Sequence, residues 1–281
     1  MMLEDIAREI RKDIMITAYR GKSGHLASAF SAVEIMTALY FGGILRYDKN
    51  NPDWAERDKV IVSKGHASLV LYSILKRIGY ITPGQLHSFC QPGSHLGGEP
   101  KYRDIPGVEA TTGSLGHGLS FAVGIALANQ LDARESHTYV LLGDGECQEG
   151  SVWEAALSAA HHGLGSLTVI LDRNKLQAMG NTEEILKLDS LEEKWQGFGW
   201  DVENVDGHDI GKLVMVLGKD REEFREQPKV IIADTVKGKG VSFMEQVPIW
   251  HYRMPNPQEM EIVRKELGIT ERELQEWGIH I

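Results

Sequence analysis

Short apolar runs alternate with helical segments along this chain, and no other feature constrains its fold as strongly. We expect strands at residues 60–62, 109–112, 139–142, 167–171, 201–205 and 230–235. Apolar residues at helical spacing predict helices at residues 3–20, 31–40, 68–78, 119–129, 152–162 and 210–217. Strands that alternate with helices are typical of an α/β fold whose mostly parallel sheet carries helices on both faces.

Two further stretches interrupt or end this alternation. Residues 84–107 hold five glycines and three prolines, which predicts a long loop. The residues beyond Pro255 are charged and have a helical pattern. We therefore expect one α/β domain over residues 1–255, followed by a helical tail over residues 256–281.

The composition excludes several classes of partner. The 281 residues carry a net charge of −10 without a basic block, which argues against nucleic acid or an anionic membrane. No apolar run approaches the roughly 20 residues that a membrane helix needs, and the N-terminal segment is unlike a signal peptide. Cys90 and Cys147 lie far apart, outside any C-x-x-C motif, as expected of free thiols in a reducing compartment. We expect a cytoplasmic protein.

Polar residues and glycines follow the predicted strands, at the edge where open parallel sheets bind ligands. These features are His66, a turn at residues 113–118, Asp144, Asn174 and the stretch at residues 235–240. The turn matches neither G-x-G-x-x-G nor G-x-x-x-x-G-K-S/T, so nicotinamide dinucleotide and P-loop sites lose support. The two lysines of the last stretch can meet an anion or stand in a solvated turn.

Asp144 and Asn174 form the most informative pair, because they end two strands that one helix joins. Both side chains offer hard oxygens, which suit Mg²⁺ or Ca²⁺. Gly143 and Gly145 flank the acid and let the backbone approach a phosphate closely. The alternative is an Asp-Gly turn followed by an asparagine that caps the next segment.

Histidines are frequent near the same predicted edge, at His25, His66, His95, His117 and His251. For each one alone, a hydrogen-bonded structural role is the simpler interpretation. Together they can share a function, because neutral imidazole donates to a diphosphate or moves protons near neutral pH.

Taken together, these segments resemble the thiamine diphosphate enzymes and, more specifically, transketolase. Residues 143–145 and then Asn174 resemble the thiamine diphosphate fingerprint of that superfamily. Residues 23–25, 63–67 and 111–116 are similar to the more specific transketolase segments. The resemblance runs from about residue 10 to 255 and covers only the first of transketolase's three domains. It implies the thiamine diphosphate-binding fold and the N-terminal, diphosphate-binding subunit of a split transketolase.

The resemblance implies a metal site and a cofactor site. Asp144, Asn174 and the backbone carbonyl of Leu176 would hold Mg²⁺ on the diphosphate, with Ca²⁺ or Mn²⁺ as substitutes. The residues that would contact thiamine diphosphate are His66, Gly113, Ser114, Leu115, Gly145 and Asn174. His25 and His251 would stand beside the reacting carbon and handle protons of the substrate.

Two positions depart from the family pattern. The family has a His-Pro pair before the Thr-Thr-Gly segment, and that histidine touches the donor sugar. Here the matching pair is Glu99-Pro100, with His95 nearby. We expect either an altered donor ketose, amino-bearing or otherwise non-standard, or a solvent-facing Glu99 with His95 in contact with the donor. His117 stands where the family has glutamine, and both residues can donate a hydrogen bond.

A glutamate that activates the cofactor's ring lies in the family's second domain, which nothing in this chain resembles. The resemblance therefore implies that the chain is inactive alone and pairs with a C-terminal, pyrimidine-binding subunit, in two copies of each. Its substrates would be sugar phosphates, exchanged by transfer of a two-carbon ketol unit. The alternatives are a subunit related to deoxyxylulose-phosphate synthase or an oxo-acid decarboxylase, and a non-catalytic cofactor-binding protein.

Overall fold

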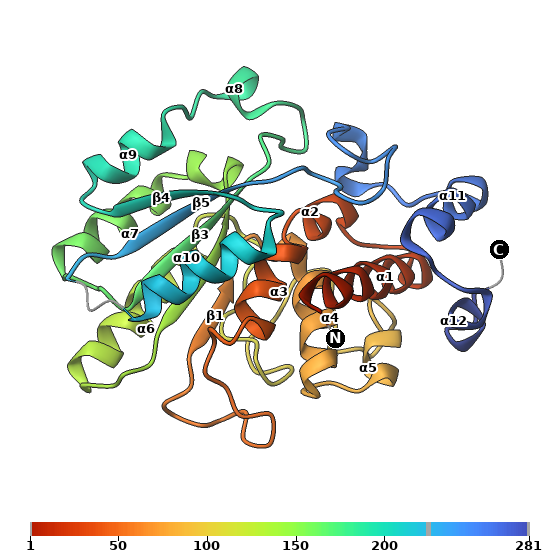
Figure 1. Ribbon diagram of the computed structural model, residues 1–281, viewed down its shortest axis with the longest axis horizontal. Helices are drawn as coiled ribbons and strands as arrows, with labels where there is room; N and C mark the ends of the chain where they lie inside the picture. The colour runs from red at the N-terminus through yellow and green to blue at the C-terminus, as the bar shows by residue number, and fades with distance from the viewer. Residues whose placement is uncertain (1, 223–225, 280–281) are drawn as a thin grey trace.

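A computed structural model describes residues 2–222 and 226–279 of the chain, without the side chains of residues 220–222. At its centre is a five-stranded sheet in the order β1-β2-β3-β5-β4, and every pairing of neighbouring strands is parallel. The strands are β1 (Lys59–Val62), β2 (Thr138–Gly143), β3 (Leu167–Arg173), β4 (Asp201–Asp206) and β5 (Lys229–Asp234). The predicted α/β fold with a parallel sheet is confirmed (Figure 1).

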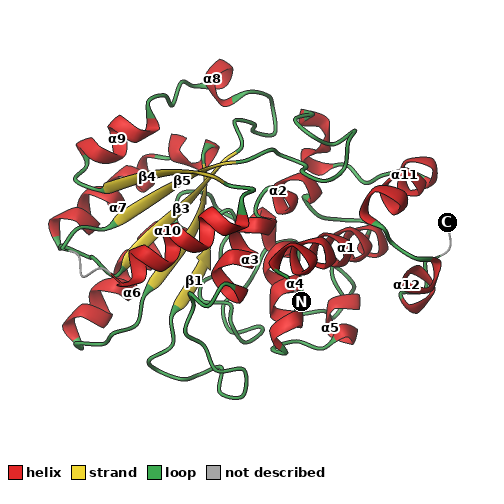
Figure 2. Ribbon diagram, in the orientation of Figure 1, coloured by secondary structure: helices red, strands yellow, loops and turns green. Residues whose placement is uncertain are grey.

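Helices cover both faces of the sheet and extend beyond its β1 side (Figure 2). The first group is α1 (Leu3–Gly21), α2 (Leu26–Phe30), α3 (Val33–Phe41), α4 (Ser68–Ile78) and α5 (Pro83–His87). The later helices are α6 (Gly118–Leu131), α7 (Gly150–His161), α8 (Thr182–Ile185), α9 (Leu191–Gly197), α10 (Ile210–Glu222), α11 (Pro257–Leu267) and α12 (Glu271–Glu276). Three short 3₁₀ turns, η1 (Gly65–Ala67), η2 (Gly145–Gln148) and η3 (Pro248–Tyr252), complete the order.

Alternate residues of the strands belong to two separate hydrophobic clusters, one on each face of the sheet. In β2, Tyr139 and Leu141 join the cluster of α1, α3, α4 and α10, whereas Val140 and Leu142 join the cluster of α6, α7 and α9. This alternation follows from the pleat, which points successive side chains to opposite faces. The central strands are apolar on both faces because helices bury both of them.

The tail forms two helices, each with a matched N-terminal cap. The side chain of Asn256 accepts a hydrogen bond from Glu259 N, and that of Thr270 accepts one from Glu273 N. Met260, Val263 and Leu274 belong to the same hydrophobic cluster as α1. The helical pattern expected after Pro255 is therefore present, although residues 280–281 lie outside the described part. The division of the chain at residue 255 stays a prediction.

Three predicted elements differ in the structure. The loop expected at residues 84–107 is shorter at its start, because residues 84–87 belong to α5. Residues 109–112 form no strand, because their polar groups bond to neighbouring segments instead of to a ladder: Thr112 Oγ1 donates to Val62 O (2.8 Å), and Glu109 pairs with Arg57. The helix expected at residues 31–40 is two helices separated by a turn at Ser31 and Ala32. Ser31 Oγ donates to Asp172 Oδ2 (2.6 Å), which ties this turn to the sheet.

Within the described ranges, no helix has the length and apolar composition that crossing a membrane requires.

Candidate active site

A cavity of about 300 Å³ lies beyond the carboxyl ends of β1, β2 and β3. Its walls come from segments spread over more than 200 residues of sequence. The lining residues are His25, Ser28, Lys64, His66, Glu99, Gly113, Leu115, Gly143, Asp144, Gly145, Glu146, Asn174, Leu176, Gln177, Ala178, Lys237 and His251. The cavity therefore brings together most of the site residues that the sequence indicated.

One end of the cavity is built by the loops that follow β2 and β3. Asp144 Oδ1 accepts a hydrogen bond from Gly145 N (2.8 Å), and Oδ2 accepts one from Lys175 N (2.6 Å). Asn174 Oδ1 accepts one from Leu176 N (3.1 Å). Burial raises the pKa of Asp144 to about 6, and the neighbouring charge of Asp172 adds to this increase. A buried carboxylate with this raised pKa is stabilised by a cation at its free lone pairs.

The carbonyl of Leu176 faces the same end and contacts Lys237. The Lys237 ammonium donates to Leu176 O (2.8 Å) and to His251 Nδ1 (3.0 Å). Burial, followed by repulsion from Lys64, lowers the pKa of Lys237 to about 8. Lys237 thus links the predicted metal end of the cavity to its histidine end.

Three histidines gather at the other end. His25 precedes α2, His66 lies in η1 and His251 lies in η3. Their ring centroids are 5.0 Å apart for His25–His251, 5.2 Å for His25–His66 and 5.5 Å for His66–His251. Burial and then the charge of Lys237 lower the pKa of His25 to about 4 and that of His251 to about 3. Burial, with Lys64 next, also lowers the pKa of His66. The cluster is therefore uncharged at neutral pH.

Lys64 lines the cavity and forms a buried ion pair with Asp172, which lies outside the lining. Lys64 Nζ lies 2.5 Å from Asp172 Oδ2 and also donates to Ser28 O (3.1 Å). Thr235 Oγ1 donates to the second carboxylate oxygen of Asp172. Burial alone would raise the pKa of Asp172, but Lys64 and the hydroxyl donors lower it overall. Neither residue stands out in the sequence, although Lys64 adjoins Gly65-His66 and Asp172 is the last residue but one of β3.

Glycines in and beside the turn at residues 113–118 are packed too closely to carry side chains. A Cβ on Gly65 would lie 2.6 Å from Gly113 N, and a Cβ on Gly113 would lie 2.8 Å from the Glu99 carboxylate. Glu146, whose role has no signal in the sequence, holds this arrangement in place. Glu146 Oε1 accepts from Gly116 N (2.9 Å) and from Ser63 Oγ (2.5 Å), and Oε2 accepts from Gly143 N (3.1 Å).

Four of the residues that the sequence pointed to need separate description. Glu99 lies against Gly113 and lines the cavity. His95 lies outside the lining, with a side chain that is 72% exposed and 4.0 Å from Asp104. Ser114 is exposed and outside the lining, although its neighbours Gly113 and Leu115 belong to it. His117 is exposed at the start of α6 and makes no capping hydrogen bond through its side chain.

The donor set fits a hard cation bound beside a phosphorylated ligand. Within the described part of the chain, no group of three or more His, Cys, Asp or Glu side chains is placed to hold a metal. Mg²⁺ needs no such group, because it completes its shell with water and phosphate oxygens. His25 Nδ1 and Gln177 Nε2 are buried at the cavity without a hydrogen-bond partner. Such orphaned polar atoms, with two ammonium groups nearby, suit a polar anionic ligand.

Comparisons with known proteins agree with this geometry. Residues 3–275 match the family model described as transketolase, thiamine diphosphate binding domain. The chain is 38% identical over 266 residues to one of the subunits of an apulose-4-phosphate transketolase from Phocaeicola vulgatus, an alignment that covers 95% of this chain and 94% of that one. It is 40% identical over 243 residues to a 6-deoxy-6-sulfo-D-fructose transketolase subunit of Clostridium sp., covering 86% and 88% of the two chains.

A solved structure gives the same result in three dimensions. The transketolase of Pichia stipitis superposes with a TM-score of 0.90 at 28% identity. The match covers 96% of this chain but only 41% of that longer chain. This chain therefore belongs to the transketolase family and corresponds to its thiamine diphosphate-binding domain.

Proposed function

We propose that this chain supplies the diphosphate- and metal-binding half of a two-chain transketolase. The complete enzyme would transfer a two-carbon ketol unit from a ketose phosphate to an aldose phosphate. The observation that carries the proposal is the convergence, in one cavity, of three neutral histidines with Asp144 and Asn174. A divalent cation, a diphosphate and a proton-exchanging substrate each find suitable groups there.

The metal is proposed to be Mg²⁺, held by Asp144, Asn174 and the carbonyl of Leu176, with Ca²⁺ or Mn²⁺ as substitutes. Hard oxygen donors favour these ions over thiophilic metals. The Lys237 ammonium lies 2.8 Å from Leu176 O and would add positive charge beside a bound diphosphate.

The diphosphate is proposed to contact His66, Gly145, Asn174 and residues 113–115. Gly113 lines the cavity without a side chain, so its backbone can approach a phosphate closely. His66 is neutral because burial lowers its pKa, so one ring nitrogen can donate to an oxygen anion without carrying a charge. Lys64 and Lys237 supply positive charge on the side where the anion would lie.

Proton handling is proposed for His25 and His251. Thiamine diphosphate, when bound, supplies the nucleophilic carbon that this chemistry requires. Both rings are neutral at neutral pH because burial and Lys237 lower their pKa values, so His25 can accept a proton from a substrate hydroxyl. The unpartnered Nδ1 of His25 is available for such a contact. His251 Nδ1 already accepts from the Lys237 ammonium, so its Nε2–H would donate to a substrate oxygen.

The donor sugar is proposed to meet Glu99. Its carboxylate lies on the cavity wall at Gly113, where the resemblance predicts a histidine. The position of His95 outside the lining weakens the alternative in which His95 takes the contact. A carboxylate accepts from donor hydroxyls and favours an amino group over an anionic one.

A pyrimidine-binding partner chain is proposed, in two copies of each subunit. Two relatives of similar length are named as transketolase subunits, and the chain matches 41% of a single-chain transketolase. A cytoplasmic location is proposed because both cysteines are free thiols.

Reconstitution tests the proposal. The purified chain should bind Mg²⁺ and thiamine diphosphate but give no ketol transfer until the pyrimidine-binding subunit is added. The assay uses ketose phosphate donors, with pyruvate as a parallel substrate. Robust turnover by the chain alone would refute the two-chain assignment. Turnover of pyruvate in place of ketose would favour the synthase or decarboxylase alternative, and binding without turnover in the assembled pair would favour a non-catalytic protein.

A further inference from the structure

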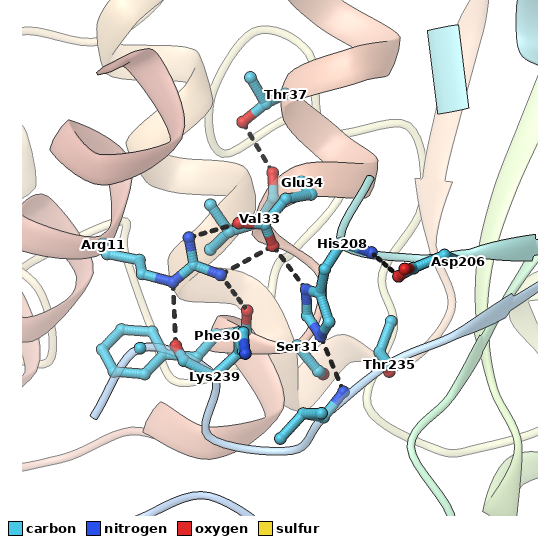
Figure 3. Close-up of polar contacts among 12 residues, drawn as sticks. Arg11, Phe30, Ser31, Val33, Glu34, Thr37, Asp206, His208, Thr235 and Lys239 are labelled. Atoms are coloured by element: carbon cyan, nitrogen blue, oxygen red, sulfur yellow. Dashed lines mark hydrogen bonds and ion pairs between the residues drawn. The ribbon is translucent and has the colours of Figure 1, made fainter. Parts of the chain in front are cut away.

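A charged trio lies behind the cavity, outside its lining. Arg11 comes from α1, Glu34 from α3 and His208 from the turn between β4 and α10 (Figure 3). Arg11 holds both oxygens of Glu34, at 2.5 Å to Oε1 and 2.7 Å to Oε2. His208 Nδ1 lies 2.9 Å from Glu34 Oε2. Arg11 and Glu34 are only 7% and 8% exposed, so these groups are held away from water.

The outer groups of this trio both reach the loop that follows β5. His208 Nε2 accepts a hydrogen bond from Val236 N (2.8 Å), and Arg11 Nε donates to Lys239 O (2.9 Å). Because Nε2 accepts, the hydrogen of a neutral His208 is on Nδ1 and points to Glu34. Glu34 therefore holds His208 in the tautomer with its hydrogen on Nδ1 and also orients the Arg11 guanidinium. Through these two side chains it holds the loop after β5 at Val236 and at Lys239.

Lys237 lies between those two points, and its side chain enters the cavity. Its ammonium contacts Leu176 O at 2.8 Å and His251 Nδ1 at 3.0 Å. The backbone around it is also held, because Gly238 N donates to Ala27 O (3.0 Å) and Gln246 N donates to Lys237 O (2.9 Å). The place of the Lys237 ammonium therefore depends on where residues 236–239 are held.

We infer that Glu34 is a positioning residue which, through Arg11 and His208, sets where Lys237 stands in the cavity. Stability alone gives little reason for this trio, because a buried ion pair often contributes no more to stability than apolar packing of the same volume. The geometry of the trio gives a reason for it. The hydrogen bonds at Val236 N and Lys239 O hold the loop on either side of Lys237, the residue of this loop that lines the cavity. Only the effect on cofactor binding rests on the proposed function.

The chain contains a matched control pair. Arg57 holds Glu109 in the same forked manner, at 2.5 Å and 3.1 Å, and both side chains are largely buried. Neither residue lines the cavity. Glu34→Gln and Glu109→Gln therefore remove the same charge from similar pairs, and only the first is connected to Lys237.

The first measurement needs no ligand. Amine-reactive labelling of the full chain, followed by peptide mass spectrometry, gives the rate at Lys237 relative to the exposed Lys101. Glu34→Gln should change the relative rate at Lys237 by about tenfold or more, whereas Glu109→Gln should leave it within about twofold. Equal changes in the two variants, or none in Glu34→Gln, would overturn the inference whatever the cofactor is.

The second measurement links the loop to binding. Calorimetry with Mg²⁺ and thiamine diphosphate, or inorganic pyrophosphate, should show a roughly 10-fold loss of affinity in Glu34→Gln, the lower end of the range for residues that orient a ligand's contacts. In a chain that already carries Lys237→Met, Glu34→Gln should lower the affinity almost no further, because the effects of two substitutions that act through one contact do not add. The inference would be contradicted if the losses of affinity from Glu34→Gln and Lys237→Met added in full, or if Glu109→Gln caused an equal loss. A wild-type chain that binds neither probe would refute the proposed function, while the labelling result would still decide the role of Glu34.

Discussion

The two ends of the cavity are built in different ways. Asp144, Asn174 and Leu176 come from two adjacent strand ends, and hydrogen bonds to nearby backbone N–H groups orient the two side chains. The histidine end collects His25 and His251 from segments more than 200 residues apart in sequence. The first end is a local product of β-α-β connectivity, whereas the second exists only once the whole domain has folded.

Their electrostatics also differ in sign. Burial raises the pKa of Asp144 and lowers the pKa of His25 and His251, so burial opposes the charged form in each case. The metal end consequently holds a carboxyl that a cation would stabilise, and the histidine end holds rings that stay neutral. The end with Asp144 is therefore suited to anchor a ligand, and the end with the neutral histidines is suited to exchange protons.

Replacing a histidine should give the largest difference between the two ends, because kcat should fall while cofactor affinity stays nearly unchanged. In the assembled enzyme, His25→Gln should lower kcat by about 100- to 10,000-fold, the range for loss of a positioned acid or base. Affinity for Mg²⁺ and thiamine diphosphate should stay within a few-fold, as measured by calorimetry. Exposed His161→Gln is the control and should change neither quantity. A parallel loss of cofactor affinity in His25→Gln would mean that the two ends do not act separately.

Asp144→Asn tests the opposite end. We expect the affinity for Mg²⁺ with thiamine diphosphate to fall by at least about 100-fold, because a charged ligand of the cation is lost. The same variant should raise the free energy of unfolding of the metal-free chain at pH 7.5 by about 2 kcal/mol, since it removes a buried carboxylate. Denaturant unfolding with and without metal measures both effects, with exposed Asp53→Asn as the control. Unchanged metal affinity would exclude Asp144 as a ligand.

The contributions of the two ends to the free energy of unfolding should change with pH in opposite directions. The pKa of His25 is lowered to about 4 and that of His251 to about 3, from 6.5, so the unfolded chain binds more protons between about pH 4 and 6.5. Their contribution to the free energy of unfolding therefore falls as the pH falls through that window, by roughly 1 kcal/mol after screening of the half-buried rings. The pKa of Asp144 is raised from 3.8 to about 6, so its contribution falls as the pH rises through its own window.

Unfolding of the metal-free chain from pH 4.5 to 7.5 checks these signs. The double variant His25→Gln, His251→Gln should flatten the decrease toward acid, and Asp144→Asn should flatten the opposing change. The same response in both variants would show that the histidines and Asp144 titrate as one unit.

Glu99 should give the smallest effect, a change in donor preference. Glu99→His should alter the ratio of kcat/KM between amino-bearing and neutral ketose donors by about 10-fold, equivalent to about 1.4 kcal/mol. A matched substitution at exposed His95, His95→Gln, should leave that ratio unchanged. A donor profile that stays the same in Glu99→His would remove the altered-donor proposal.

The sequence predicted the parts of the fold that local patterns determine. All five strands of the sheet were expected within one or two residues. Four of them are apolar runs of the length typical of buried parallel strands, whereas the edge strand β4 is mostly polar and followed from the β/α alternation. The segment at residues 109–112, expected as a strand, has only one apolar residue, and its threonine and glutamate side chains bond to β1 and to Arg57. Composition does not reveal such tertiary contacts.

The site could be predicted only where it follows from strand ends or from the family resemblance. Asp144 and Asn174 stand out because each directly follows an apolar run. Lys64, Glu146 and Lys237 carry much of the cavity's charge, yet their sequence context leaves a solvated lysine or glutamate equally plausible. Their burial is a property of the assembled fold, which brings β1, η2 and the loop after β5 together.

The strand order has a consequence for how the protein is made. β5 lies between β3 and β4 and pairs with both, although it is the last of the described strands in sequence. Among the described strands, β4 has no other partner, so it must wait for β5 before it joins the sheet. His251 follows later still. A ribosome-bound chain that ends before this residue would contain Asp144 and Asn174 but lack one of the three cavity histidines, so the cavity cannot be complete until synthesis has passed residue 251.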